Sequence, residues 1–149
     1  MIRFPTAARV AVLGVALALS ACSMSPMMGG TRMTMTQLSG AGEVPAVASA
    51  GTGTAETSFN KDTYLLRWTV TYSGLSGPAT GGHFHGPAMP GQNAPVVVPF
   101  TGSLASPISG EKILTPAQAS DLLAGKWYVN LHTAANPGGE IRGQAMMGQ

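Results

Sequence analysis

The sequence predicts an all-β domain: an antiparallel, Greek-key-like β-sandwich or barrel with one short helix. Short segments that alternate apolar and polar residues recur from residue 52 onward, and this is the period of half-buried strands. Turns rich in glycine and proline separate these segments. Only one segment carries the start and stop signals of a helix. Many short strands joined by such turns are typical of an antiparallel sandwich or barrel.

Six strands are expected from the alternating segments. The first two flank a turn-like segment at residues 60–63 and predict a β-hairpin. The prolines of the fourth strand favour its ends or the edge of a sheet, because proline donates no backbone hydrogen bond. The expected strands are residues 52–59, 64–72, 79–85, 95–100, 126–132 and 140–146.

The helix is predicted by its own capping residues. Thr115 supplies the N-cap, Pro116 takes the first helical position, and Gln118 completes a capping box with Thr115. Gly125 is a stop signal, so we expect a helix over residues 116–124. We expect this helix to pack against one end of the barrel and to carry no site.

The N-terminus predicts a lipoprotein signal peptide over residues 1–21. Arg3 and Arg9 form its basic region, and the apolar stretch that follows is too short to span a bilayer as a mature helix. The segment ends in Leu-Ser-Ala-Cys, which resembles the bacterial lipobox, so Cys22 is expected to be lipidated and to anchor the protein to a membrane. The alternative is an ordinary secretory signal with a chance cysteine. Ser23, which is not aspartate, favours the outer membrane, with the domain facing the periplasm or the cell surface.

Residues 22–36 are expected to form a flexible tether, and residues 37–149 the β-domain. The tether is rich in methionine, serine, glycine and threonine and has no apolar period. Its five methionines carry thioethers, which are soft ligands that suit Cu(I). The alternative is that the tether is only a low-complexity spacer.

The charge balance gives no reason to expect nucleic acid as a partner. Removal of Arg3 and Arg9 with the signal peptide leaves six basic against six acidic residues, so the mature chain is formally neutral. Cys22 is the only cysteine of the sequence, and therefore no disulfide can form within the chain. The sequence identifies no protein partner.

All three histidines of the chain fall in two expected strands. Side chains alternate between the two faces of a strand, so His83 and His85 share one face while Phe84 takes the other. In the later strand His132 lies on the face opposite to the apolar residues. We expect the apolar residues to form the core and the three histidines to lie outside it, on the exterior of the barrel.

Three imidazoles on one face predict a site for a single transition-metal ion. Neutral imidazoles suit Cu(II), Zn(II) and Fe(II), and the affinity order among divalent ions favours copper. Three histidines leave a fourth position open for water or for the thioether of Met146 or Met147. The alternatives are that the histidines bond the backbone of nearby loops, or that they bind a different ligand.

Three further residues are expected to assist the histidines. Asn130 and Glu140 are candidates for orienting the imidazole N–H groups. Arg142 is expected to draw in anions and to disfavour protonation of the histidines. For Glu140 the alternative is an exposed carboxylate that pairs with Arg142. The sequence shows no Ser-His-Asp arrangement and no phosphate-binding glycine loop.

Three segments stand in order along the chain. They are Leu-Ser-Gly-Ala-Gly-Glu-Val-Pro at residues 38–45, Gly-His-Phe-His-Gly-Pro-Ala at residues 82–88, and residues 122–144, which run from Leu-Leu-Ala-Gly-Lys-Trp-Tyr to Gly-Gly-Glu-Ile-Arg-Gly-Gln. Together they resemble the CHRD (chordin-type) domain family over residues 38–144. The resemblance implies an extracytoplasmic β-domain and no established biochemical activity.

A His-x-His strand, a later strand histidine and a Gly-Gly turn leading to an arginine are similar to the copper half of the Cu,Zn superoxide dismutase family. This resemblance implies that His83 and His85 are the paired copper ligands and His132 the late copper ligand. It also implies that Arg142 guides an anionic substrate. The chain departs from that family because it has no histidine for a zinc site or a copper–zinc bridge, and it cannot form the family's disulfide.

The sequence therefore predicts a lipid-anchored, extracytoplasmic domain that binds one transition-metal ion, with copper favoured, for metal capture, buffering or transfer. Two rival hypotheses stand beside it. The first is a copper enzyme similar to superoxide dismutase, which needs reversible Cu(I)/Cu(II) cycling and open access for anions. The second is a metal-free interaction module at the cell surface, which predicts that the histidines can be removed without loss of stability or partner binding.

Overall fold

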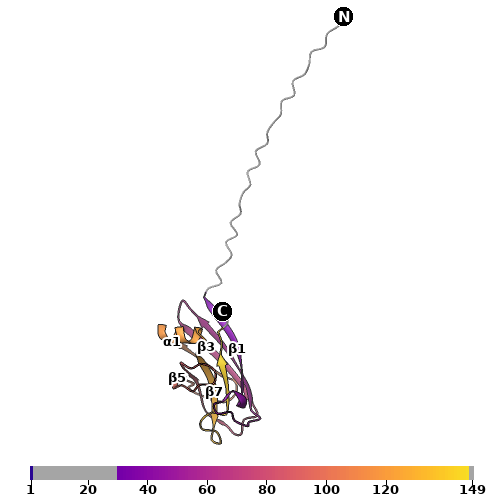
Figure 1. The fold of residues 1–149 in the computed structure, drawn as a ribbon, viewed down its shortest axis with the longest axis vertical. Helices are drawn as coiled ribbons and strands as arrows, with labels where there is room; N and C mark the ends of the chain where they lie inside the picture. Colours follow the sequence, from indigo (N-terminus) through magenta and orange to yellow (C-terminus); the bar gives the residue numbers. More distant parts are fainter. Residues whose placement is uncertain (2–29, 148–149) are drawn as a thin grey trace.

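A single antiparallel sheet, curled into a nearly closed barrel, forms the domain (Figure 1). The structure is a computed structural model that describes residue 1 and residues 30–147 of the 149-residue chain. Residues 2–29 contain the predicted lipidation site Cys22, most of the predicted signal peptide and the first part of the predicted tether. These predictions lie outside the described residues.

The described residues form eight strands, one α-helix and one turn of 3-10 helix, joined by loops. The helices are α1 (Pro116–Leu123) and η1 (Gly40–Gly42). The strands lie in the order β5-β4-β7-β8-β1-β2-β3-β6, and neighbours pair antiparallel, which confirms the predicted all-β class. The strands are β1 (Thr31–Ser39), β2 (Thr52–Asn60), β3 (Leu65–Ser73), β4 (Ala79–His85), β5 (Val96–Pro99), β6 (Ile108–Ile113), β7 (Trp127–Thr133) and β8 (Ile141–Ala145).

All six strands expected from the sequence are present, and each end lies within one residue of its predicted position. The expected hairpin is formed by β2 and β3, which pair along their whole lengths. Strand β5 lies at the edge of the sheet, as its prolines predicted.

Strands β1 and β6 have no counterpart among the expected strands. Strand β1 pairs with β2 along its whole length, so residues 31–36 belong to the β-domain and not to a tether. Met33 and Met35 face outward and are 75% and 64% exposed, while Thr34 and Thr36 face inward. In this part of β1 the pattern is the reverse of an amphipathic strand. In β6, which lies at the other edge of the sheet, only Ile108 is buried.

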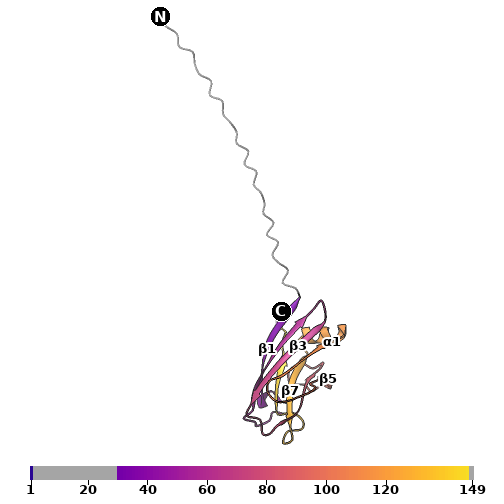
Figure 2. The ribbon, with the colours of Figure 1, turned by 180° about the vertical axis from the view of Figure 1, so that it is seen from behind.

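The helix forms where its capping residues predicted it. Thr115 Oγ1 accepts a hydrogen bond from Gln118 N, and Gln118 Oε1 accepts one from Thr115 N, so both halves of the capping box are present. Helix α1 lies near the end of the domain at which β1 begins (Figure 2). In the described part of the chain, no helix has the length and apolarity needed to cross a bilayer.

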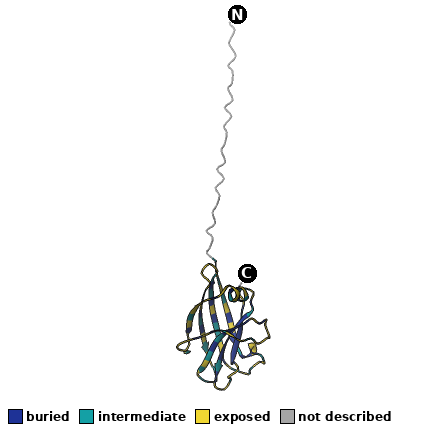
Figure 3. Ribbon diagram, turned by 90° about the vertical axis from the view of Figure 1, so that its left-hand side faces the viewer, coloured by how far each residue is buried: buried dark blue, intermediate teal, exposed yellow. Residues whose placement is uncertain are grey.

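Apolar side chains fill the interior of the barrel, and Figure 3 shows buried residues along its strands. At the centre, Trp68 stacks on Phe100 with ring centroids 5.2 Å apart and meets Phe84 edge-on at 5.5 Å. The burial of Phe84, Trp127, Val129 and Leu131 confirms the strand faces predicted to form the core. Leu66, Trp68 and Val70 of β3 belong to the same core.

Candidate metal centre

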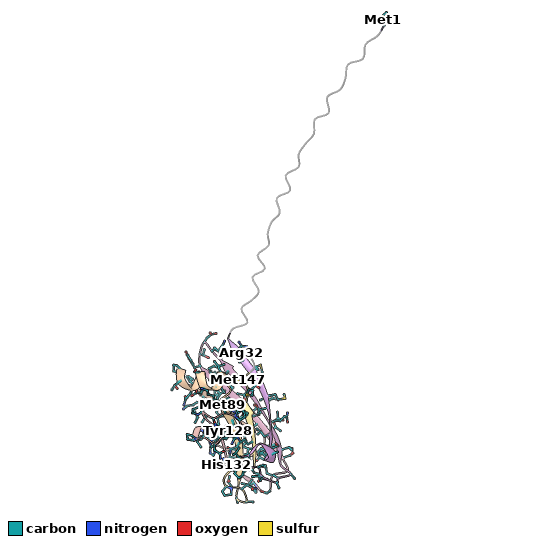
Figure 4. The ribbon with its side chains drawn as sticks, in the orientation of Figure 1. Met1, Arg32, Met89, Tyr128, His132 and Met147 are labelled. Atoms are coloured by element: carbon teal, nitrogen blue, oxygen red, sulfur yellow. The ribbon has the colours of Figure 1, made fainter. Side chains whose placement is uncertain are left out.

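The three histidines come together across two neighbouring strands. His83 and His85 lie on β4, and His132 lies on β7, which pairs with β4. One ring nitrogen from each histidine lies within 4.8 Å of the other two. His83 Nδ1 and His132 Nε2 are 3.1 Å apart. Figure 4 places His132 toward the end of the domain that is remote from the start of β1. The structure thus gathers the three residues that the sequence analysis named as ligands.

The histidines occupy the face of the sheet that is turned away from the core, as their parity predicted. Phe84 between the paired histidines is fully buried in the core, so its neighbours project the other way. This face is not an open exterior, however. His85 is only 8% exposed, and the adjacent Tyr128 and Asn130 are buried too, because the loop of residues 86–95 covers this part of the sheet. The predicted exterior position is therefore corrected to a covered one for His85, whereas His83 and His132 are half-buried.

Polar contacts hold the covering loop, residues 86–95, against the sheet. Ala94 O lies 2.9 Å from His85 Nδ1, and Ala94 N donates a hydrogen bond to the Tyr128 hydroxyl at 3.2 Å. On β8, Gln144 Nε2 donates to Ala88 O at 3.0 Å. The His85 ring also stacks on Tyr128, with centroids 4.8 Å apart and planes 2° from parallel. His85 is thereby fixed in orientation from two sides.

A backbone carbonyl sets which ring nitrogen of His85 is protonated. Ala94 O is an acceptor 2.9 Å from His85 Nδ1, so Nδ1 carries the hydrogen in the neutral ring and Nε2 carries none. His132 Nδ1 likewise lies 2.9 Å from a carbonyl oxygen, that of Pro137. His85 Nε2 is buried and has no hydrogen-bond partner among the described residues. This is the arrangement in which metal-binding histidines are held by their second nitrogen.

The pKa values favour the neutral, metal-binding form of the paired histidines. Burial, with the neighbouring His132 and His85, lowers the pKa of His83 from 6.5 to about 4. Burial also lowers the pKa of His85, although its hydrogen bond to Ala94 opposes the shift. Both rings are therefore uncharged near neutral pH, and no proton has to leave them before a cation binds.

Asn130 lies where the sequence analysis placed it, beside the histidines. It is 2% exposed, and its Oδ1 atom is 3.0 Å from His132 Nε2. Asn130 thus contacts one of the three imidazoles directly.

Glu43 is a member of this neighbourhood to which the sequence analysis gave no role. It follows η1, is 7% exposed, and its Oε1 atom has no hydrogen-bond partner among the described residues. Burial raises the pKa of its carboxyl from 4.5 to about 7, although the charge of Arg142 and a hydrogen bond from Asn130 act against the shift. The only sequence signal for Glu43 was its place in the first of the three segments that resemble the CHRD family.

Arg142 does not face an open path for anions. It is 3% exposed, and its guanidinium carbon lies 3.4 Å from the centre of the Tyr128 ring. Arg142 is on β8, and Tyr128 is on the neighbouring strand β7. Its Nη atoms donate to Asn93 Oδ1 at 2.8 Å and to Gln92 O at 2.6 Å. These contacts engage the guanidinium in holding the covering loop, so the predicted guidance of anions has no geometric support.

Glu140 neither orients an imidazole nor pairs with Arg142. Its side chain is fully buried and accepts hydrogen bonds from the hydroxyls of Ser49, Ser76 and Thr133 and from the backbone N–H of Ser76. Burial alone would raise its pKa, but these bonds outweigh burial and hold the pKa at about 2. The carboxylate joins the start of β8 to two loops and has a structural role.

The two methionines proposed as soft ligands also lie elsewhere. Met147 is 4% exposed and packs in the hydrophobic core, and Met146 lies against Gly125 beyond the end of α1. Ala145, just before them, pairs with Trp127, which is five residues and roughly 17 Å along β7 from His132. Neither thioether therefore reaches the histidines in this structure.

A cavity of about 520 Å³ lies away from the histidines, over β2, β3 and β6, where an exposed pair, Arg67 and Glu111, lines it together with Met33. A metal centre needs no such cavity, because its ligands lie only about 2 Å from the ion. We therefore base the site on the histidine geometry and not on cavity size.

A comparison with protein families gives a match to the CHRD domain family over residues 34–145, about three-quarters of the chain. The matched range contains the three histidines, Asn130 and Glu43. It begins within β1, in agreement with the earlier start of the domain. Searches of curated proteins and of solved structures found no match. The chain belongs to the CHRD domain family.

Proposed function

We propose that this domain binds one divalent transition-metal ion through His83, His85 and His132, and that it serves metal capture, buffering or transfer. The observation that carries the proposal is His85 Nε2, which is buried without a hydrogen-bond partner among the described residues. A buried lone pair without a partner costs free energy. A cation bound between the three imidazoles would remove that cost.

The surroundings of the histidines support the same proposal. Two of the three rings hydrogen-bond a backbone carbonyl through Nδ1, which leaves Nε2 for a ligand. Such bonds orient the rings in the absence of metal, so little conformational entropy remains to be lost on binding. Histidines kept only to bond loop backbone would have no reason to bring their second nitrogens together.

Copper is the ion that we propose. Imidazole nitrogens suit Cu(II), Zn(II) and Fe(II), and Cu(II) stands highest in the affinity order of divalent first-row ions. A lipid anchor at Cys22 is part of the proposal and rests on the Leu-Ser-Ala-Cys segment of the sequence. The anchor would hold the metal-binding domain at the outer membrane, on the periplasmic side or at the cell surface.

Titration of the full chain with Cu(II) or Zn(II), after treatment with a chelator, tests this proposal. We expect saturation at one ion per chain and a rise in the thermal unfolding midpoint, because a ligand that binds only the folded state stabilises it. The gain is about 2.7 kcal/mol when free metal exceeds the dissociation constant a hundredfold. Mg(II), which prefers oxygen ligands, is the control and should leave the midpoint unchanged. Absence of saturable binding of both ions would contradict the proposal.

A further inference from the structure

Asn130 brings an oxygen atom into the cluster of imidazole nitrogens. Its Oδ1 atom lies 3.0 Å from His132 Nε2, and His132 Nε2 lies 3.1 Å from His83 Nδ1. The ligand atoms of a tetrahedral site with bonds of about 2.0–2.1 Å are roughly 3.3 Å apart. Both separations are close to the spacing of neighbouring ligands around one ion.

The contact between Asn130 and His132 is unfavourable for a neutral ring. Such a ring carries one N–H, but both of its nitrogens face acceptors: Pro137 O is 2.9 Å from Nδ1, and Asn130 Oδ1 is 3.0 Å from Nε2. When the hydrogen is on Nδ1, the lone pairs of Nε2 and Oδ1 point at each other. The other tautomer moves the same conflict to Pro137. A cation placed between Nε2 and Oδ1 turns this repulsion into attraction to a shared ion.

Glu43 explains why the amide of Asn130 presents oxygen, and not nitrogen, to the histidines. A side chain at Gly139 would come within 2.4 Å of Glu43 Oε1 and 2.8 Å of Asn130 Nδ2, so both groups lie against this glycine. Nδ2 of Asn130 therefore lies on the side of the amide that is turned toward Glu43, whereas Oδ1 faces the imidazole of His132. Only the nitrogen of an amide can donate to a carboxyl, so this orientation suits both neighbours.

We infer that Asn130 Oδ1 is a fourth ligand of the proposed metal centre, completing a set of three imidazole nitrogens and one amide oxygen. This inference rests on the proposed function and extends it. The fourth position is then filled from within β7 and needs neither methionine from the C-terminus nor a residue of the tether. An oxygen ligand suits divalent Cu(II) or Zn(II) better than the soft Cu(I) ion. The site thus favours the divalent state over Cu(I).

Substitution of Asn130 in the full chain tests the inference. We would measure Zn(II) affinity by competition with a chromophoric chelator, and the absorption spectrum of bound Co(II), which reports the number and kind of ligands. Asn130→Leu and the smaller Asn130→Ala remove the oxygen, whereas Asn130→Asp keeps one. Thr57→Val, which removes a buried and unpartnered hydroxyl from β2, is the matched control. Circular dichroism checks that each variant folds.

The expected result is a change in the Co(II) spectrum and at least a tenfold loss of Zn(II) affinity in the leucine and alanine variants. Asn130→Asp should retain the affinity, and Thr57→Val should behave like the wild type. A Co(II) spectrum that is the same in the wild type and in Asn130→Ala would overturn the inference, whatever the affinity, and would leave the three-histidine site in place. A wild-type chain that binds neither ion would overturn the proposed function itself.

Discussion

Replacing His83 and His85 together with alanine is expected to lower the affinity for Cu(II) or Zn(II) by more than about a hundredfold. Loss of a residue that only orients a ligand costs roughly 10- to 100-fold in affinity, and this variant loses two ligands. His132 is then the only imidazole left to hold the ion, with the amide oxygen of Asn130 beside it. Isothermal titration calorimetry of the full-length variant would measure the change.

Glu56→Gln is the matched control for this experiment. It removes an exposed carboxylate from β2, on the half of the sheet that carries no histidine, and should leave the affinity unchanged. Equal affinities in the wild type and the double variant would show that metal binds elsewhere on the chain, and the histidine site would have to be abandoned.

Replacing Glu140 with glutamine is expected to lower the free energy of unfolding by about 2–3 kcal/mol near neutral pH. The carboxylate accepts four hydrogen bonds, and bonds to a charged group contribute about 1.5–3 kcal/mol each. Glutamine keeps one oxygen but places an NH₂ group where the second oxygen accepts hydrogen bonds from two hydroxyls. These hydroxyls can rotate to accept from the NH₂ group, and this offsets part of the loss. Urea unfolding of both proteins would measure the difference.

The effect of this substitution should depend on pH. The pKa of Glu140 is about 2 in the folded chain and 4.5 without the fold, so the unfolded chain takes up this proton first as the pH falls. The stabilisation by Glu140 is therefore complete above about pH 4.5 and is lost toward pH 2. We expect the difference between the wild type and Glu140→Gln to shrink over this window. A difference that stays constant between pH 6 and pH 3 would contradict the assigned hydrogen bonds.

Elements with local signals could be predicted from the sequence, and those without them could not. Helix α1 was predicted because Thr115 and Gln118 make their capping contacts within one turn. Strands with alternating apolar and polar residues were predicted because this alternation is also a local signal, which neighbouring residues carry. Strand β1 was missed because Met33 and Met35 face solvent while threonines face inward. Its identity as a strand comes from its pairing with β2 and not from its own pattern.

The part of the candidate site that could be predicted is the part set by the alternation of side chains along each strand. Parity placed His83, His85 and His132 on one face, and pairing of β4 with β7 brought them together. The covering loop was not predictable, because Arg142 on β8 helps to hold it. Glu43 was missed for a similar reason, since its contact with Asn130 depends on the arrangement of distant segments.

Two functional assignments failed because position in the sequence was taken as proximity to the site. Glu140 follows the Gly-Gly turn close to His132, but its carboxylate turns toward Ser49, Ser76 and Thr133. Met147 lies two residues beyond the end of β8, and its side chain packs in the core, away from the histidines. A buried carboxylate needs several hydrogen-bond donors, and Glu140 finds them in these hydroxyls and not in the imidazoles.

X-ray absorption spectroscopy of the full chain, loaded with one equivalent of Cu(II) or Zn(II), tests the three-histidine centre most directly. The account predicts nitrogen or oxygen scatterers at about 2.0–2.1 Å and an outer-shell signal from three imidazole rings. A spectrum fitted by one imidazole or none, or by sulfur at about 2.3 Å, would contradict it.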